Sequence, residues 1–209
     1  FKFNDINCFF SLSLCIKRCC IKNYYFLMKL DLIKLKKVKS TNDEAIKIIK
    51  SKKNKQGIII TNLQTKGKGT MGKKWVSLKG NLFASIFFEL KQNMPKADEF
   101  SLINPLIIKK ILNEYSKFEV KIKWPNDLLI KSKKVCGILQ ELIKLDRKSF
   151  LIIGIGINTH RSPCNKKFKS ISLIECSDKT INNNVILKNL KKNYELSNWR
   201  YWKYKYKNL

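Results

Sequence analysis

The sequence predicts an α+β fold in which helices flank a mixed, mostly antiparallel central sheet. Helix and strand patterns do not alternate regularly: one helix and two strands are followed by a second helix and then by a run of strands. The turns between these last strands are short, which favours antiparallel hairpins over parallel crossovers. A chain of 209 residues, 44% of them hydrophobic, is long enough to bury one core.

The elements of the first half follow from apolar periodicity. A short strand within 29–39 leads into a helix start where Thr41 and Glu44 have capping-box spacing, so that the hydroxyl can accept from a free N–H of the first turn. Apolar residues at helical spacing continue this helix to about Lys52. The next two predicted strands, both rich in β-branched or aromatic residues, are 57–62 and 81–90.

The second half begins with a helix over 98–115, where apolar residues recur at helical spacing. Pro105 lies inside that stretch and should kink the helix or mark its real start. Short apolar runs separated by tight turns follow, which is typical of hairpin strands. The remaining predicted elements are strands over 119–123, 127–130, 135–143 and 149–157, and an amphipathic helix over 181–196.

The formal net charge of +29 is typical of proteins that bind nucleic acid or an anionic membrane surface. Only four of the 44 basic residues are arginine, however, and the lysines are spread along the chain among many Asn and Ile residues. Base readout favours arginine and a clustered patch. A solvated, lysine-rich surface, as an AT-rich genome produces, therefore explains the charge better than a dedicated nucleic-acid surface.

The seven cysteines include no C-x-x-C pair, and His160 is the single histidine, which argues against a structural zinc site. Free cysteines fit a reducing, cytoplasmic setting. The apolar run 8–16 is too short to span a bilayer. We expect 1–27 to be a non-native or disordered leader, with a membrane-tethering tail as the alternative, and 176–209 to hold the last helix and an unassigned tail.

Three glycines lie in the string GKGTMG at 67–72, which satisfies the G-x-G-x-x-G dinucleotide fingerprint and is one residue short of a P-loop. Both alternatives require a helix directly after the loop, because its N-terminus binds the phosphate. The segment 74–80 leads into a strand instead. The glycines and their neighbouring lysines therefore predict a flexible cationic loop that can close on an anion; these lysines are Lys66, Lys68, Lys73 and Lys74.

Five short motifs, which follow one another in order along the chain, resemble those of the biotin protein ligases. S-T-N stands at 40–42, and QTKGKGTMGKKW at 64–75 is similar to that family's Q-x-x-G-R-G-R-x-G-R-x-W loop with lysine in place of arginine. K-W-P-N-D stands at 123–127 as the family has it. KVCGIL at 134–139 resembles K-x-x-G-I-L, and GIGIN at 154–158 resembles G-x-G-x-N. The ordered set is far more specific than any one motif alone.

The resemblance implies the catalytic-domain fold of biotin and lipoate ligases, which is similar to class II synthetases, over 28–175. It implies two half-reactions, in which biotin and ATP give biotinyl-5′-AMP and pyrophosphate, and a carrier lysine then takes the biotinyl group and releases AMP. Biotin is the implied substrate, and ATP and Mg²⁺ are the implied cofactors. The implied partner is a biotin carboxyl carrier protein of acetyl-CoA carboxylase. Neither specific DNA binding nor membrane association is expected, and a homodimer is left open.

The resemblance also assigns site residues. Lys134, Lys68 and Asp127 are the expected catalytic residues: the lysines would hold the biotin carboxylate and then the adenylate phosphate, while Asp127 would meet the triphosphate, Mg²⁺ or the incoming amine. The expected biotin-binding residues are Ser40, Thr41, Asn42, Gln64, Gly67, Lys68, Gly69, Thr70, Trp75, Lys134 and Gly137. The expected ATP-binding residues are Lys68, Thr70, Lys123, Asn126, Asp127 and Asn158.

Alternatives remain at single positions and for the whole chain. S-T-N is also an ordinary helix start, and Lys134 taken alone is an ordinary solvated lysine. Thr70 stands where the family often has a second arginine, so one charge on the phosphate is missing. No pattern for an N-terminal winged helix or a C-terminal β-barrel is recognisable, so an operator-binding role is not expected. The competing functions are a lipoate or octanoyl ligase or transferase and, in another class, a lysine-rich nucleic-acid-binding module.

Overall fold

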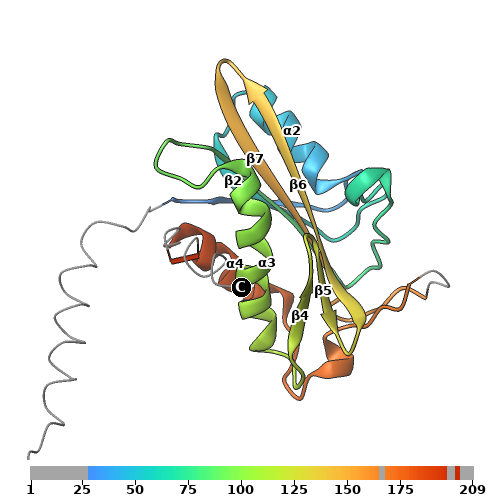
Figure 1. Cartoon of the computed structure of the whole chain (residues 1–209). Helices are drawn as coiled ribbons and strands as arrows, with labels where there is room; N and C mark the ends of the chain where they lie inside the picture. Colours follow the sequence, from blue (N-terminus) through green and yellow to red (C-terminus); the bar gives the residue numbers. More distant parts are fainter. Residues whose placement is uncertain (1–27, 165–167, 197–200, 203–209) are drawn as a thin grey trace, which may run out of the picture.

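The computed structural model describes residues 28–164, 168–196 and 201–202. The predicted leader and most of the predicted tail therefore lie outside the described residues. A seven-stranded sheet in the order β1-β2-β3-β7-β6-β5-β4 forms the centre of the fold (Figure 1). Its strands are β1 (Asp31–Leu35), β2 (Gln56–Thr61), β3 (Leu82–Glu89), β4 (Val120–Lys123), β5 (Asp127–Ile130), β6 (Lys133–Leu145) and β7 (Lys148–Ile157).

The sheet is mixed, as the sequence predicts. β1 pairs with β2 in parallel, and all other neighbouring strands pair antiparallel. The parallel pair arises because α2 (Thr41–Lys50) carries the chain from the end of β1 back to the start of β2. The later strands are joined by the tight turns that the sequence indicates, and β6 and β7 form one long hairpin.

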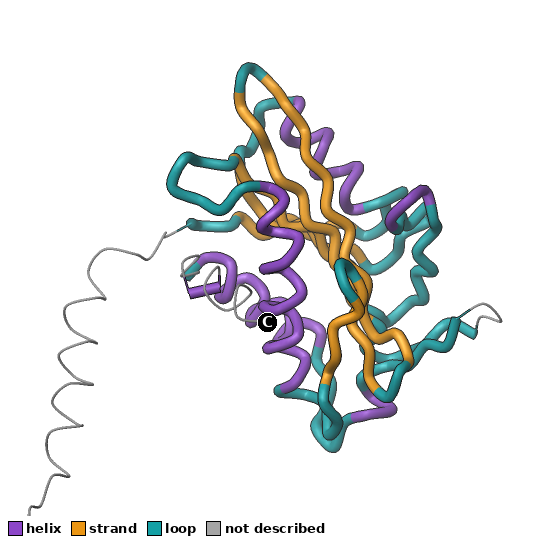
Figure 2. Tube along the Cα trace, in the orientation of Figure 1, coloured by secondary structure: helices purple, strands orange, loops and turns teal. Residues whose placement is uncertain are grey.

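Helices cover both faces of the sheet (Figure 2). α2 packs on one face through a small core cluster, and α3 (Ala97–Asn113) and α4 (Asn183–Glu195) pack on the other through the main core. The two-residue period of β7 explains the division, since Phe150 and Ile152 belong to the α2 cluster while Leu151 and Ile153 belong to the main core. Within the described part of the chain, no helix combines the length and apolarity needed to cross a membrane.

Every predicted helix and strand is present, within a few residues of its predicted ends. Pro105 lies in the interior of α3, which begins at Ala97, so it does not mark the start of the helix.

The predicted capping box at the start of α2 is wrong. Ser40 is the N-cap residue, and it makes no side-chain cap hydrogen bond. The Thr41 hydroxyl donates to Gln64 Oε1 (3.1 Å) and accepts from Ser85 Oγ (2.7 Å), and Glu44 pairs with Lys47 (2.7 Å). Both side chains of the expected box are therefore engaged elsewhere.

Candidate active site

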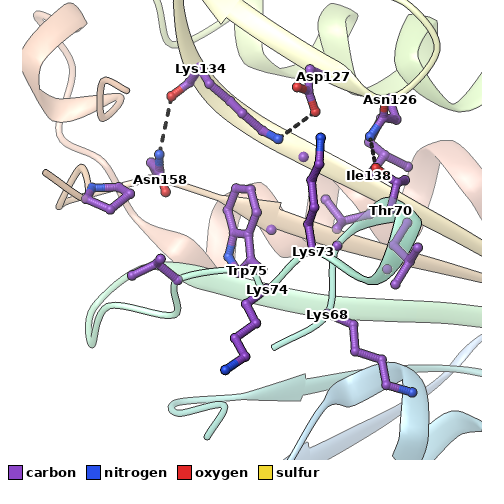
Figure 3. A pocket seen from close by; sticks show the side chains of 18 of the residues that line it. Lys68, Thr70, Lys73, Lys74, Trp75, Asn126, Asp127, Lys134, Ile138 and Asn158 are labelled. Atoms are coloured by element: carbon purple, nitrogen blue, oxygen red, sulfur yellow. Dashed lines mark hydrogen bonds and ion pairs between the residues drawn. The ribbon is translucent and has the colours of Figure 1, made fainter. Parts of the chain in front are cut away.

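A cavity of about 760 Å³ lies on the α2 face of the sheet, beyond the end that α2 covers. The start of α2, the glycine loop (66–74), the β4–β5 turn and strands β6 and β7 enclose it. Figure 3 shows Lys134, Asp127 and Asn126 on one side of this space and the glycine loop on the other, with Lys73 directed towards Asp127. The fold therefore brings segments that are far apart in the sequence together around the cavity.

The floor of the cavity is sheet backbone from which side chains are missing. Gly137 of β6 and Gly156 of β7 are direct register partners. A Cβ at Gly137 would lie 2.6 Å from Trp75 Cζ3, and one at Gly156 would lie 2.5 Å from Trp75 Cε2. The indole thus rests on the two strands at a distance that only glycine permits. Its Nε1 is buried and has no hydrogen-bond partner, which leaves a donor beside the cavity.

A polar network forms the end of the cavity beside α2. Gln64 Oε1 accepts from the Thr41 backbone N–H (2.8 Å) as well as from its hydroxyl. Asn42 Nδ2 donates to Glu141 Oε2 (2.6 Å), and Asn42 Oδ1 accepts from Ser85 Oγ (2.5 Å). Most of these groups are almost inaccessible to solvent: Ser40, Thr41, Asn42 and Ser85 are each 3% exposed or less. Buried, mutually bonded amides and hydroxyls of this kind hold fixed positions.

The opposite end of the cavity carries charge. Lys134 Nζ lies 2.6 Å from Asp127 Oδ1, and both side chains are less than a quarter exposed. The β5–β6 pairing shifts register between Leu128 and Leu129, so a bulge lies between Asp127 and the residue opposite Lys134. Asn158 Nδ2 donates to the Lys134 carbonyl (3.3 Å). The backbone of Lys134 is therefore held in place while its ammonium faces the cavity.

The glycine loop is a small hairpin. The Gly69 N–H donates to the Lys73 carbonyl (2.7 Å), and the Trp75 N–H donates to the Gly67 carbonyl (2.9 Å). A single 3-10 turn, η2 (Thr70–Gly72), forms its tip, and no α-helix follows it before β3. The helix that a P-loop or a dinucleotide fingerprint requires is thus absent from this fully described segment.

Two side-chain contacts join the glycine loop to its surroundings. Asn126 Nδ2 donates to Thr70 Oγ1 (3.1 Å), which links the tip to the β4–β5 turn. Lys68 Nζ forms an ion pair with Asp43 in the first turn of α2. The hydrogen bond to Asp43 is the main cause that raises the pKa of Lys68 above its ordinary value, and the charge of Glu141 adds to it.

The residues predicted from the sequence lie together, with one exception. All of them except Gly67 line the cavity. Gly67 lies behind the wall, where an added Cβ would meet Ser77 Oγ and the Trp75 carbonyl at 2.7 Å. Lys68 points away from Lys134 and Asp127 (Figure 3). Several residues that line or support the cavity carry no motif in the sequence, namely Ser85, Glu141, Phe168 and Lys169. Gly154 and Gly156 belong to the G-x-G-x-N motif, but the sequence assigns neither of them a role in the site.

Residues 35–158 match the model of the biotin/lipoate A/B protein ligase family. The chain belongs to this family. The match includes β2 to β7, α2 and α3, and thus nearly every wall of the cavity. The mixed sheet with helices on both faces agrees with the fold of the family's solved structures.

Relatives similar to this chain include both curated proteins and solved structures. The bifunctional ligase/repressor BirA of Escherichia coli strain K12 is 38% identical over 101 residues, which are 47% of this chain and 32% of BirA. The chain thus spans about a third of the length of that relative. The biotin protein ligase of Aquifex aeolicus, solved with biotin and ATP, is 30% identical with a TM-score of 0.67, covering 84% of this chain and 72% of that structure.

The fold is shared more widely than these relatives. The Leishmania major biotin protein ligase, solved with biotinyl-5-AMP, superposes with a TM-score of 0.69 at 24% identity, covering 79% of this chain and 73% of its own. A putative lipoate protein ligase from T. acidophilum, solved with bound lipoic acid, superposes with a TM-score of 0.55 at 12% identity, covering 85% and 94%. These two likenesses concern the fold alone, so the ligand has to be argued from the cavity.

Proposed function

We propose that this chain joins biotin to a lysine of a biotin carboxyl carrier protein, with ATP, through biotinyl-5′-AMP. The observation that carries the proposal is the polarity of the cavity: an end lined by hydroxyl and amide groups and a cationic end face each other across a glycine and indole floor. Biotin has the same order of parts, since a ureido ring, an apolar chain and a carboxylate follow one another.

The polar end suits a ureido group. That group offers two N–H donors and one carbonyl acceptor, and it is recognised best by fixed partners of both kinds. Thr41, Asn42 and Gln64 present hydroxyl and amide groups that the network with Ser85 and Glu141 fixes in place. The dithiolane ring of lipoate offers neither N–H donors nor a carbonyl acceptor, so it would gain no hydrogen bonds from these groups and would bind more weakly than biotin.

The middle of the cavity suits an apolar chain. The Trp75 indole covers the strand backbone at Gly137 and Gly156, and its other side lines the cavity. An aliphatic chain laid along the indole would bury apolar area. This surface runs from the polar end of the cavity towards Lys134, so the carboxylate of a bound acid would lie near Lys134.

The cationic end suits the first half-reaction. A carboxylate oxygen of biotin attacks the α-phosphorus of ATP, and the bond from that phosphorus to the pyrophosphate oxygen breaks. The attack brings an anion up to a polyanion, so fixed positive charge stabilises it. Lys134 lies at this end in its ion pair with Asp127, and Lys73 and Lys123 add two further positive charges. In the second half-reaction, the carrier amine attacks the acyl carbon, AMP leaves, and the amine loses its proton.

Magnesium fits this end only together with ATP. Among the described residues, no group of three or more His, Cys, Asp or Glu side chains is arranged to hold a metal. Mg²⁺ is often held by one or two carboxylates together with substrate phosphates, however. Asp127, with the amide of Asn126 beside it, would supply that protein share. The ion would neutralise phosphate oxygens.

ATP–pyrophosphate exchange tests the proposal. With the protein, ATP, Mg²⁺ and labelled pyrophosphate, biotin should promote incorporation of label into ATP, whereas lipoate and octanoate should not. Exchange with lipoate but not with biotin would favour the related ligases instead. Salt-dependent retention on DNA without exchange would favour the nucleic-acid-binding alternative.

The proposal of a carboxylase carrier follows the Paracoccus denitrificans biotin–[acetyl-CoA-carboxylase] ligase. That ligase is 28% identical to this chain over 132 residues, which are 62% of this chain and 55% of the ligase.

A further inference from the structure

Asp43 makes a contact that the proposed reaction does not use. It lies in the first turn of α2, next to S-T-N, where a carboxylate is favoured by the helix dipole. Its Oδ1 forms an ion pair with Nζ of Lys68 in the glycine loop. Lys68 therefore spans from the loop to α2, and its ammonium is directed away from Lys134 and Asp127 (Figure 3).

This arrangement conflicts with direct use of Lys68 on an anion in the cavity. The side chain lines the cavity, yet its charge is already neutralised by Asp43. The pair is partly open to solvent, since the two side chains are 44% and 29% exposed. An ion pair of that kind contributes little free energy and exchanges readily. It can therefore hold the loop without preventing Lys68 from moving to a ligand.

We propose that Asp43 is a positioning residue: it holds Lys68, and with it the glycine loop, against α2 in the ligand-free protein and releases Lys68 to an anionic ligand. The ion pair then exists only in the free state. Removing Asp43 destabilises the free state alone, so it loosens the loop and at the same time tightens the binding of an anion. A residue that merely supports the fold would not produce these opposite effects.

The loop part of this proposal is tested by amide hydrogen exchange in the full chain without ligand. The reporters are the Gly69 and Trp75 amides, whose hydrogen bonds close the hairpin. Asp43→Asn and Lys68→Met should each speed their exchange, by up to about fivefold for an exposed ion pair. The double variant should exchange no faster than either single variant, and Asp43→Glu should restore protection. Unchanged exchange in Asp43→Asn would overturn the proposal.

A matched control is available in another exposed ion pair. Lys52 Nζ lies 2.6 Å from Asp146 Oδ2. Asp146 lies at the tip of the β6–β7 hairpin, and neither residue of this pair lines the cavity. Asp146→Asn removes one negative charge, as Asp43→Asn does, and it should leave exchange at both reporter amides unchanged. Equal acceleration in the two variants would mean that net charge, and not the contact with Lys68, governs the loop.

The ligand part rests on the proposed function and uses biotin and its alcohol analogue, which lacks the carboxylate. Asp43→Asn should lower the Kd of biotin by up to about fivefold and leave the Kd of the alcohol unchanged. In the Lys68→Met background the same change should have no effect on biotin. Weaker or unchanged biotin binding in Asp43→Asn would overturn the release step. Failure of the unaltered chain to bind biotin would overturn the proposed function, while the exchange result would still decide whether Asp43 holds the loop.

Discussion

Replacing Gly156 by alanine tests the packing of Trp75 on the sheet. The added Cβ would lie 2.5 Å from Trp75 Cε2 and 2.8 Å from Cζ2. Carbon atoms in contact normally lie about 3.5–4.0 Å apart, so the indole would have to retreat by about 1 Å. Overpacking of this kind costs about 1–3 kcal/mol. For a domain of this size, that corresponds to a fall in Tm of roughly 2–12 °C.

A double-mutant cycle separates this clash from a general intolerance of alanine in β7. With Trp75→Ala in the background, the added methyl group has space, so Gly156→Ala should cost less by about 1 kcal/mol or more. Gly154→Ala is the matched control on the same strand, because its Cβ would meet Asn42 and not Trp75. Its cost should be the same in both backgrounds.

The assay is urea or thermal unfolding of the four variants of each cycle, which measures stability without using the activity. If the cost of Gly156→Ala arose from strand geometry and not from the indole, it would be equal with and without Trp75, within about 0.5 kcal/mol. That result would refute the packing of Trp75 on Gly137 and Gly156, and with it the indole wall in the middle of the cavity.

Three further predictions concern single residues. Lys134→Ala should slow biotin-dependent pyrophosphate release on the order of a hundredfold, as loss of one preorganised charge does. Lys144 is an exposed lysine on the same strand, and Lys144→Ala should not slow the release. Equal rates in the two variants would reduce Lys134 to a surface lysine. Thr70→Arg should slow the escape of bound adenylate in a chase experiment by about tenfold, because hydrogen bonds to charged groups contribute more than neutral ones. Faster or unchanged escape would contradict the idea that a positive charge at position 70 helps to retain the adenylate. Burial raises the pKa of the Cys136 thiol far above its ordinary range. Iodoacetamide at neutral pH should therefore label Cys136 only after unfolding, whereas it should label the exposed Cys164 at once. Similar labelling rates of the two thiols in the native protein would show that Cys136 is accessible.

The elements of this fold could be predicted because their patterns are strong. The apolar runs of β3 and β7 are buried on both faces, and the sequence shows them as continuous hydrophobic stretches. The cavity could be anticipated from motifs, since S-T-N, the glycine loop, K-W-P-N-D and K-x-x-G-I-L all contribute to its lining. Short-range patterns therefore indicate the helices and strands, and the motifs indicate which segments line the cavity.

The individual contacts could not be predicted because sheet register and loop packing determine them. Glu141 meets Asn42 only because alternate residues of β6 face α2. Lys68 was expected to face the substrate, and its pairing with Asp43 depends on where the glycine loop packs. The expected capping box fails for the same reason, since Gln64 competes for the hydroxyl of Thr41. Spacing along the sequence carries no information about such partners.

Transfer of labelled biotin to a carrier tests whether this chain is a biotin protein ligase. The protein would be incubated with ATP, Mg²⁺, labelled biotin and a biotin carboxyl carrier domain, alongside a carrier whose acceptor lysine is replaced by arginine. Covalent label is expected on the intact carrier only, and it should depend on ATP and not be competed by lipoate. Absence of ATP-dependent label on the intact carrier, or transfer of lipoate in place of biotin, would contradict it.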